Sequence, residues 1–382
     1  YYIDRYADCG DRKMDPVVRD LLRTGVYQML CMDRIPDRAV VNETVSLCDE
    51  FRASRAKSFV NAVLRKIASH KNELPEIPGK GTADYLTVRY SHPAWICEYL
   101  IREKGYDFAE AFLQENNTAP RTDLQINTVR ISCADFRRKL EEAGIACEMP
   151  TAPADCLITG NGNVTAFPGF AEGEFFVQDI AARLAVDAAE LKPGMRVIDT
   201  CASPGGKSFS AAVAMHDQGY ILSCDISQKK ADAIRSGAER LRFSIIHTEV
   251  ADAKVCRPEL EGQFDAAIVD VPCSGIGVIR KKPEIRNKTR EEISGLPLVQ
   301  RQILGNVCSY VRPGGILIYS TCTVIREENE GVCAEFLREH PEFEPEEFTA
   351  GAVRSAGGCY TFWPNVDGTD GFFIARFRRK PI

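Results

Sequence analysis

The sequence predicts an α/β fold for the C-terminal part of the chain, preceded by a small α+β unit and an all-α region. The chain has 382 residues, which is enough for two or three domains. From residue 166 onward, short apolar segments alternate with amphipathic segments, a pattern typical of a parallel sheet with helices on both faces. Residues 1–70 instead repeat apolar side chains at helical spacing.

The N-terminal region, residues 1–70, is expected to be helical. The segments "PVVRDLLRTGVYQMLCM" and "SRAKSFVNAVLRKI" each place apolar residues along one helical face, and Asn42 indicates a helix start shortly before Val45. The next segment, "KNELPEIPGKGT" at residues 71–82, contains two prolines, two glycines and several charges. This composition predicts a linker.

The middle region, residues 83–165, mixes helical and extended patterns. "HPAWICEYLIREKG" predicts a helix with Pro93 near its first turn. "RTDLQINTVRIS" alternates like a strand, and "CADFRRKLEEAG" predicts a helix that ends at Gly144. A small α+β unit is expected here.

The C-terminal region, residues 166–382, supplies the strands of the predicted sheet. They are "RVIDTCA", "YILSCDIS", "FSIIHTEVAD", "FDAAIVDVP", "GILIYSTC" and "GFFIARF", with helices expected from Gly206, over "QKKADAIRSGAERL", around 298–310 and over 329–340. Ligands of parallel α/β sheets sit at the carboxyl ends of the strands. Two of these strands are followed at that end by a cysteine, Cys273 and Cys322.

Composition excludes several classes of protein. No apolar run approaches the ~18 residues of a membrane span, and no secretory signal opens the chain. The 15 cysteines are odd in number and form no C-x-x-C pair, which favours free thiols in a reducing cytosol and argues against a structural zinc site. The net charge of −6 argues weakly against nucleic acid, but "IRKKPEIRNKTR" holds six basic residues in twelve.

The segment "VIDTCASPGGKS" reads as a strand, a tight turn and a helix start. Gly206, Lys207 and Ser208 fit the end of a P-loop, but Cys201 occupies the first glycine position. Pro204 lies in the turn and has no N–H to offer a phosphate. A nucleotide-binding P-loop protein is therefore the weaker alternative.

A nucleoside cofactor explains the acidic residues at the strand ends. Asp225 ends the next strand, where a carboxylate can bind both ribose hydroxyls, and Asp252 follows the third strand, where it could meet an adenine edge. With Asp199 and Asp270, four successive strands end at or near an aspartate. S-adenosylmethionine fits this carboxylate-rich rim best, because its sulfonium and amino groups are cationic.

A thiol beside a methyl donor suits one particular chemistry. Carbon 5 of cytosine is a poor nucleophile, but attack of a thiolate on carbon 6 makes it electron-rich. Asp270 is the candidate acid that protonates N3 of the ring. The spacing of Cys273 and Cys322 leaves open which thiol attacks.

Four motifs carry a family resemblance: "DTCASPGGKS", "DVPCSGIGVIRKKPEIR", "YSTCTVIREENE" and "DGTDGFFIARF". Together they closely resemble the bacterial 16S rRNA (cytosine-5)-methyltransferases of the Sun/Fmu (RsmB-type) family. "RTGVYQML" and "IPDRAVVNETVSL" look like the NusB-like RNA-binding domain of that family, here at least one helix short, so we expect a truncated N-terminus. The resemblance implies a Rossmann-like S-adenosylmethionine-dependent methyltransferase domain over 166–382 and a subdomain like an RNA-recognition motif over 83–165.

The resemblance also implies roles for individual residues. Cys322 would be the nucleophile, and Cys273 would assist proton removal and product release. The residues implied to hold S-adenosylmethionine are Cys201, Ala202, Ser203, Pro204, Gly205, Gly206, Lys207, Asp225, Asp252 and Asp270. Those implied to contact RNA are Arg280, Lys281, Lys282 and Arg286. The family usually has Thr at the position of Ile276 and His or a similar residue near Lys282, which affects substrate contacts rather than catalytic groups.

The implied partner is 16S ribosomal RNA of the small subunit, without DNA or membrane, for a protein expected to be a cytoplasmic monomer. A non-catalytic NusB-like RNA-binding scaffold is a second alternative, and the intact pair of cysteines argues against it.

Overall fold

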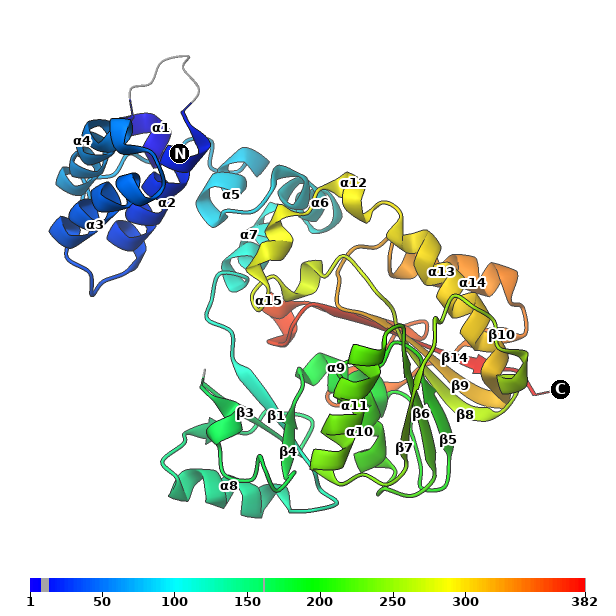
Figure 1. The fold of residues 1–382 in the computed structure, drawn as a ribbon. Coiled ribbons are helices and arrows are strands. Elements are labelled where there is room, and N and C mark those ends of the chain that lie inside the picture. The colour runs from blue at the N-terminus through cyan, green and yellow to red at the C-terminus, as the bar shows by residue number, and fades with distance from the viewer. Residues whose placement is uncertain (8–13, 161, 382) are drawn as a thin grey trace. The chain divides into compact units, whose positions relative to one another are not determined.

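The computed structural model describes residues 1–7, 14–160 and 162–381. The chain divides into two compact units, Tyr1–Ser91 and His92–Ile382 (Figure 1). Among the described residues, no helix is both long enough and apolar enough to span a membrane.

The first unit is helical. Its helices are α1 (Tyr2–Tyr6), α2 (Pro16–Cys31), α3 (Asp37–Glu50), α4 (Lys57–Ser69) and α5 (Ala83–Tyr90). Asp15 caps α2 by accepting a hydrogen bond from Val17 N, and Pro16 occupies the first helical position. The helix start expected at Asn42 is wrong, because α3 already begins at Asp37, directly after Pro36. Leu22, Met29, Val60, Leu64 and Ile67 are among the residues that form the core of this unit.

The second unit contains a small antiparallel sheet. Its strands are β1 (Thr122–Ile126), β2 (Cys147–Glu148), β3 (Cys156–Thr159) and β4 (Phe175–Val177), in the order β2-β3-β1-β4. Helices α6 (Ala94–Lys104) and α7 (Tyr106–Glu115) precede it, and α8 (Cys133–Glu142) packs on it through Phe136, which meets Phe175 at 5.2 Å between ring centroids.

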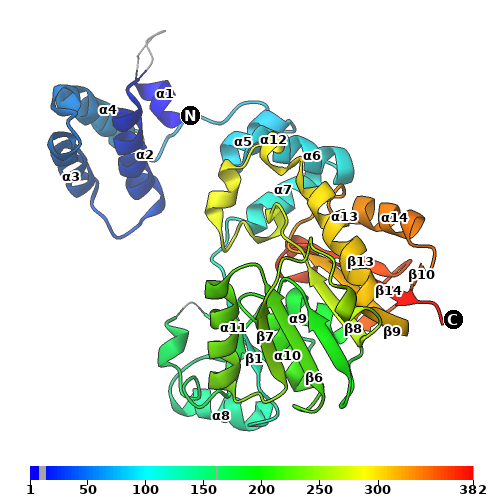
Figure 2. The ribbon, with the colours of Figure 1, turned by 45° about the vertical axis from the view of Figure 1, so that its right-hand side comes forward.

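A larger sheet follows in the order β10-β14-β9-β8-β5-β6-β7, with β13 also paired to β14. Its strands are β5 (Arg196–Asp199), β6 (Tyr220–Asp225), β7 (Ile246–Val250), β8 (Phe264–Asp270), β9 (Val311–Thr321), β10 (Phe343–Pro345), β13 (Cys359–Phe362) and β14 (Phe372–Arg379). One face carries α9 (Ile180–Asp187), α10 (Gly206–Ala214) and α11 (Gln228–Leu241), and the other carries α13 (Leu296–Val307) and α14 (Glu330–Glu339) (Figure 2).

The sheet is mixed rather than wholly parallel, which corrects the sequence prediction. Strands β5 to β9 pair in parallel, but β14 runs antiparallel to β9, with Phe373 opposite Thr321. The cause is β13, which pairs antiparallel with β14 from Cys359 opposite Ala375 to Phe362 opposite Phe372. Strand β14 therefore begins next to the carboxyl end of β9 and runs antiparallel to it.

Candidate active site

The turn after β5 is held in place by its neighbours. Gly205 has φ of +111°, and a Cβ there would lie 2.3 Å from the Phe209 ring, so glycine is required at this position. Asp225, at the end of β6, accepts a hydrogen bond from Ser203 N at 3.0 Å. This bond ties the turn to the neighbouring strand and leaves the start of α10 facing the carboxyl end of the sheet.

Two cavities open at this end of the sheet. One, of about 400 Å³, has a lining that includes Cys201, Ser203, Asp225, Asp252, Asp270, Cys273 and Cys322. The other, of about 590 Å³, has a lining that includes Cys201, Ala202, Ser203, Pro204, Gly206, Lys207, Asp270, Lys281, Lys282 and Cys322. The cavities share Cys201, Ser203, Asp270 and Cys322. A molecule in each would therefore approach the same thiol and carboxylate.

The two thiols expected to act together lie side by side. The sulfur atoms of Cys273 and Cys322 are 3.2 Å apart, because the parallel strands β8 and β9 pair Asp270 with Ser320 just before them. The hydrogen bond to Cys322, together with burial, raises the pKa of Cys273 well above its ordinary value. The same bond lowers the pKa of Cys322 and outweighs burial there. These two directions favour Cys322 as the thiol that ionises first, with Cys273 as the donor of the hydrogen bond between them.

Lys207 and Asp270 form an ion pair beside the thiols, with 2.6 Å between Nζ and Oδ2. The other oxygen of Asp270 accepts a hydrogen bond from Ser320 at 2.8 Å. Burial would lower the pKa of Lys207, but the neighbouring carboxylates raise it, and the ammonium in turn helps to lower the pKa of Cys322. The Lys207 ammonium is therefore paired with the Asp270 carboxylate and favours ionisation of the Cys322 thiol.

The basic run after Cys273 is only partly free to meet RNA. The Arg280 side chain is 6% exposed and pairs with Glu115 at 2.8 Å and Asp370 at 3.4 Å. Lys281 pairs with Asp370 at 2.7 Å, and Arg286 donates to the backbone oxygen of Asn116.

Lys282 differs from these neighbours. It lines the larger cavity, and within the described part of the chain its side chain forms no ion pair.

Sequence reasoning missed the acidic wall of the larger cavity. Asp123, Asp179 and Asp370 line it around Lys281. Burial raises the pKa of Asp123 to about 6 and that of Asp370 to about 7. The sequence did carry one signal, because Asp179 precedes an apolar helix and caps α9 at Ala181 N. A capping pattern does not reveal that the same carboxylate also faces a cavity.

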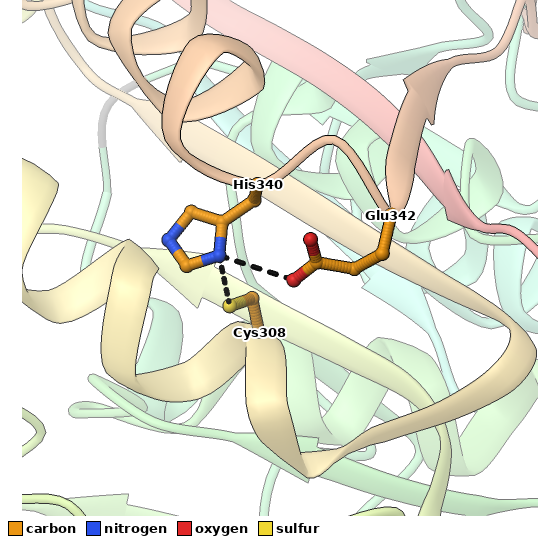
Figure 3. Close-up of side chains that lie close together, drawn as sticks. All are labelled: Cys308, His340 and Glu342. Carbon is orange, nitrogen blue, oxygen red and sulfur yellow. Dashed lines mark hydrogen bonds and ion pairs between the residues drawn. The ribbon is translucent and has the colours of Figure 1, made fainter.

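A separate cluster joins Cys308, His340 and Glu342 (Figure 3). Nδ1 of His340 lies 3.5 Å from the Cys308 sulfur and 3.2 Å from Glu342 Oε1, while the thiol donates to Gly305 O. An Nδ1–H shared toward the carboxylate accounts for these contacts without a metal ion. Cys308 precedes β9 and Cys322 follows it, so the cluster and the thiol pair lie at opposite ends of this strand.

Comparison with known proteins places this geometry in a family. The family model for the 16S rRNA methyltransferase RsmB/F matches residues 187–378, the NusB family model matches 1–69, and the RsmF/B-like ferredoxin-like domain matches 92–165. The probable ribosomal RNA small subunit methyltransferase B of Bacillus subtilis is 34% identical over 97% of this chain and 84% of its own length. Its namesake from Synechocystis is 32% identical over 98% and 88%.

Two solved structures share the fold of this chain. The crystal structure of PH0851 is 28% identical, with a TM-score of 0.80 over 95% of this chain and 82% of its own. NSun6 from Pyrococcus horikoshii, solved with SFG, shares the fold at 19% identity and a TM-score of 0.68, over 75% of this chain and 98% of its own.

The expected family, fold class and cofactor are confirmed, and the cofactor is S-adenosylmethionine. The smaller cavity fits it, because its lining includes the Asp225 and Asp252 carboxylates and both thiols. The chain belongs to the RsmB/F family of 16S rRNA methyltransferases.

Proposed function

We propose that this protein methylates carbon 5 of a cytosine in 16S ribosomal RNA through a covalent bond between Cys322 and carbon 6 of the base. The observation that carries the proposal is the pair of sulfur atoms, 3.2 Å apart, where the two cavities meet. The smaller cavity would hold S-adenosylmethionine, with Asp225 at the ribose and Asp252 near the adenine. The larger one would take the cytosine, turned out of its stack.

The proposed reaction begins with the Cys322 thiolate. It attacks carbon 6, a carbon–sulfur bond forms, and the displaced electron pairs move through the ring to N3, which takes a proton. Asp270 faces both cavities and touches the Lys207 ammonium, so it would take a proton from Lys207 and pass it to N3. Carbon 5 is then electron-rich and accepts the methyl group that S-adenosylmethionine supplies.

Release requires a base, and Cys273 is the group that would provide it. After losing its own proton to water, Cys273 takes the proton from carbon 5. The C5–C6 double bond forms again, the carbon–sulfur bond breaks, Cys322 leaves as thiolate, and the N3 proton returns to the Lys207–Asp270 pair. Once Cys322 is bonded to carbon, it no longer carries the charge that raises the pKa of Cys273. Cys273 therefore becomes easier to ionise at the stage that needs a base.

The RNA would lie across the larger cavity. Lys282 is the member of the basic run best placed to meet a phosphate, because Arg280 and Lys281 are engaged in internal ion pairs. The NusB-like and ferredoxin-like regions supply further RNA-binding surface. We propose a monomer that acts in the cytoplasm, where ribosomal RNA is assembled.

Two variants test this function. With 16S RNA and radiolabelled S-adenosylmethionine, Cys322→Ala should transfer no label to carbon 5, and Cys273→Ala should accumulate an enzyme–RNA adduct that survives a denaturing gel. Calorimetry should detect S-adenosylmethionine binding in both, and no ATP binding that depends on Lys207. Full activity in Cys322→Ala would refute the assignment of the nucleophile.

A further inference from the structure

Two buried side chains form hydrogen bonds to the backbone on either side of Cys273. Glu328 is 1% exposed and Gln300 is fully buried. Glu328 Oε2 accepts a hydrogen bond from Ser274 N at 2.9 Å, and Gln300 Nε2 donates to Pro272 O at 3.0 Å. Gln300 Nε2 also donates to Glu328 Oε2 at 2.8 Å, which closes the clamp. The residues before and after the thiol are thus fixed through a single carboxylate.

The same carboxylate residue is anchored to the strand that carries the other thiol. Tyr319, in β9, donates its hydroxyl to the backbone oxygen of Glu328 at 2.6 Å. Ser274 and Thr323, each directly after one of the two cysteines, are joined by a hydrogen bond of 2.7 Å between their hydroxyls. The clamp therefore sets the position of one thiol relative to the other.

Burial raises the pKa of the Glu328 carboxyl, while its hydrogen bonds to Ser274 and Gln300 and the charge of Lys288 favour the ionised form. A buried carboxylate is costly unless it is paired, and within the described residues no lysine or arginine forms an ion pair with it. Lys288 acts on this carboxylate through its charge, but its ammonium donates to Ser274 O at 2.7 Å. A glutamine could make a similar hydrogen bond without the cost, so the negative charge itself calls for a role.

We propose that Glu328 is a positioning residue of the methyl-transfer reaction, which with Gln300 fixes Cys273 against Cys322 and by its charge opposes ionisation of Cys273. Together with the charge of the Cys322 thiolate it keeps Cys273 protonated before Cys322 has bonded to the base, and after that bond has formed it sets how readily Cys273 ionises. This inference rests on the proposed function.

The charged groups around the two thiols differ. Cys273 is faced by Cys322, by the carboxylates of Glu328 and Asp270, and by the neutral hydroxyl of Tyr319. Cys322 is faced by Asp270 as well, but also by the cations Lys207 and Lys282. After Cys322 has formed its carbon–sulfur bond, Glu328 and Asp270 are the charges that still oppose ionisation of Cys273. They set the pH at which the proton of carbon 5 can be removed.

The test measures ionisation of Cys273 without RNA, in a Cys322→Ser background. Alkylation by iodoacetamide, followed peptide by peptide by mass spectrometry across a pH series, gives the midpoint for Cys273. Glu328→Gln should lower this midpoint by about one pH unit, the size expected for loss of a neighbouring like charge. The matched control is Glu327→Gln, which removes the same charge from an exposed neighbour paired with Arg290 and should leave the midpoint unchanged. An unchanged midpoint in Glu328→Gln, or an equal shift in the control, would overturn the role of the charge.

Gln300→Met tests the clamp separately, because it removes the hydrogen bonds and keeps the charge. With RNA, in the presence of Cys322, it should slow release of the enzyme–RNA adduct severalfold while the pH midpoint of release stays in place. Release at the wild-type rate would overturn the clamp. Absence of any adduct, even in Cys273→Ala, would instead refute the proposed function. The alkylation result does not depend on that outcome, because it is measured without RNA.

Discussion

Replacing Gly277 with alanine should force the loop after Cys273 away from the segment at Gly371 and strain its hydrogen bond to the loop of Cys322. Gly277 donates its N–H to Cys322 O at 3.1 Å, and its own carbonyl accepts from Gly371 N at 2.8 Å. A Cβ at Gly277 would lie 1.9 Å from Gly371 O and 2.5 Å from the adjoining carbonyl carbon. Both obstacles are backbone atoms, so no side-chain rotation can relieve the clash.

The size of the effect follows from these contacts. The backbone segments at Gly277 and Gly371 must separate by more than 1 Å before the added Cβ reaches an ordinary contact of about 3.5 Å with Gly371 O. This costs both hydrogen bonds, at about 1 kcal/mol each, and crowding adds about 1–3 kcal/mol. A loss of roughly 3–5 kcal/mol corresponds to a fall in Tm of about 10 °C for a domain of this size.

Differential scanning calorimetry of Gly277→Ala measures this fall, and the rate at which iodoacetamide alkylates Cys322 reports the local damage. Gly295→Ala is the matched control, because a Cβ there would meet no atom within 4 Å and its φ of −82° suits any residue. A Tm for Gly277→Ala within 2 °C of the wild type, as in the control, would refute the reasoning.

Three further outcomes are expected. Lys207→Met should raise the pH of half-maximal Cys322 alkylation by about one unit, because the ammonium lowers the pKa of that thiol; an unchanged midpoint would contradict this. Burial raises the pKa of Asp199 from 3.8 to about 7, so this group makes the folded state lose stability as pH rises from about 4 to about 7. Asp199→Asn should therefore lose less stability than the wild type between pH 5 and 8 in urea titrations, and an identical loss would count against it. Arg280→Ala should destabilise by about 1.5–3 kcal/mol, since it removes the ion pairs of a buried cation with Glu115 and with the buried Asp370, which keeps Lys281 as a partner, whereas Lys282→Ala should leave Tm unchanged and reduce the salt dependence of RNA binding; the reverse pattern would overturn both roles.

The strands of the large sheet could be predicted because each is a short apolar run bounded by turn residues. The run at 264–270 is one strand in the structure, and the helix expected around 298–310 is α13 at Leu296–Val307 followed by a 3-10 turn to Tyr310. The direction of β14 could not be predicted in this way. An apolar run fixes neither the direction of a strand nor its partner, and here the partner is set by a hairpin-like pairing with β13.

The ion-pair partners of the basic run could not be predicted from the sequence. Six cations in twelve residues suggested an RNA-binding surface, but charge counts do not reveal a partner distant in sequence. Glu115, which lies 165 positions before Arg280, turns that cation inward. Lys281 is likewise taken by Asp370, which the sequence marks only as part of a glycine-rich motif. The proximity of the two thiols and the glycine turn after β5 could be predicted, because each of them directly follows a strand of one sheet.

The spacing of the two cysteines does not determine which thiol acts first, but the charges around them favour one order. Two cations, Lys207 and Lys282, lie toward Cys322, whereas Cys273 is held beside the unpaired carboxylate of Glu328. A nucleophile must be ionised before the base arrives, but a proton acceptor is needed only after methyl transfer. Exchanging the two roles would place the early thiolate beside a buried anion and leave the cations next to a thiol that has no charge to stabilise. The electrostatics of the fold thus favour Cys322 as nucleophile for a reason independent of the family resemblance.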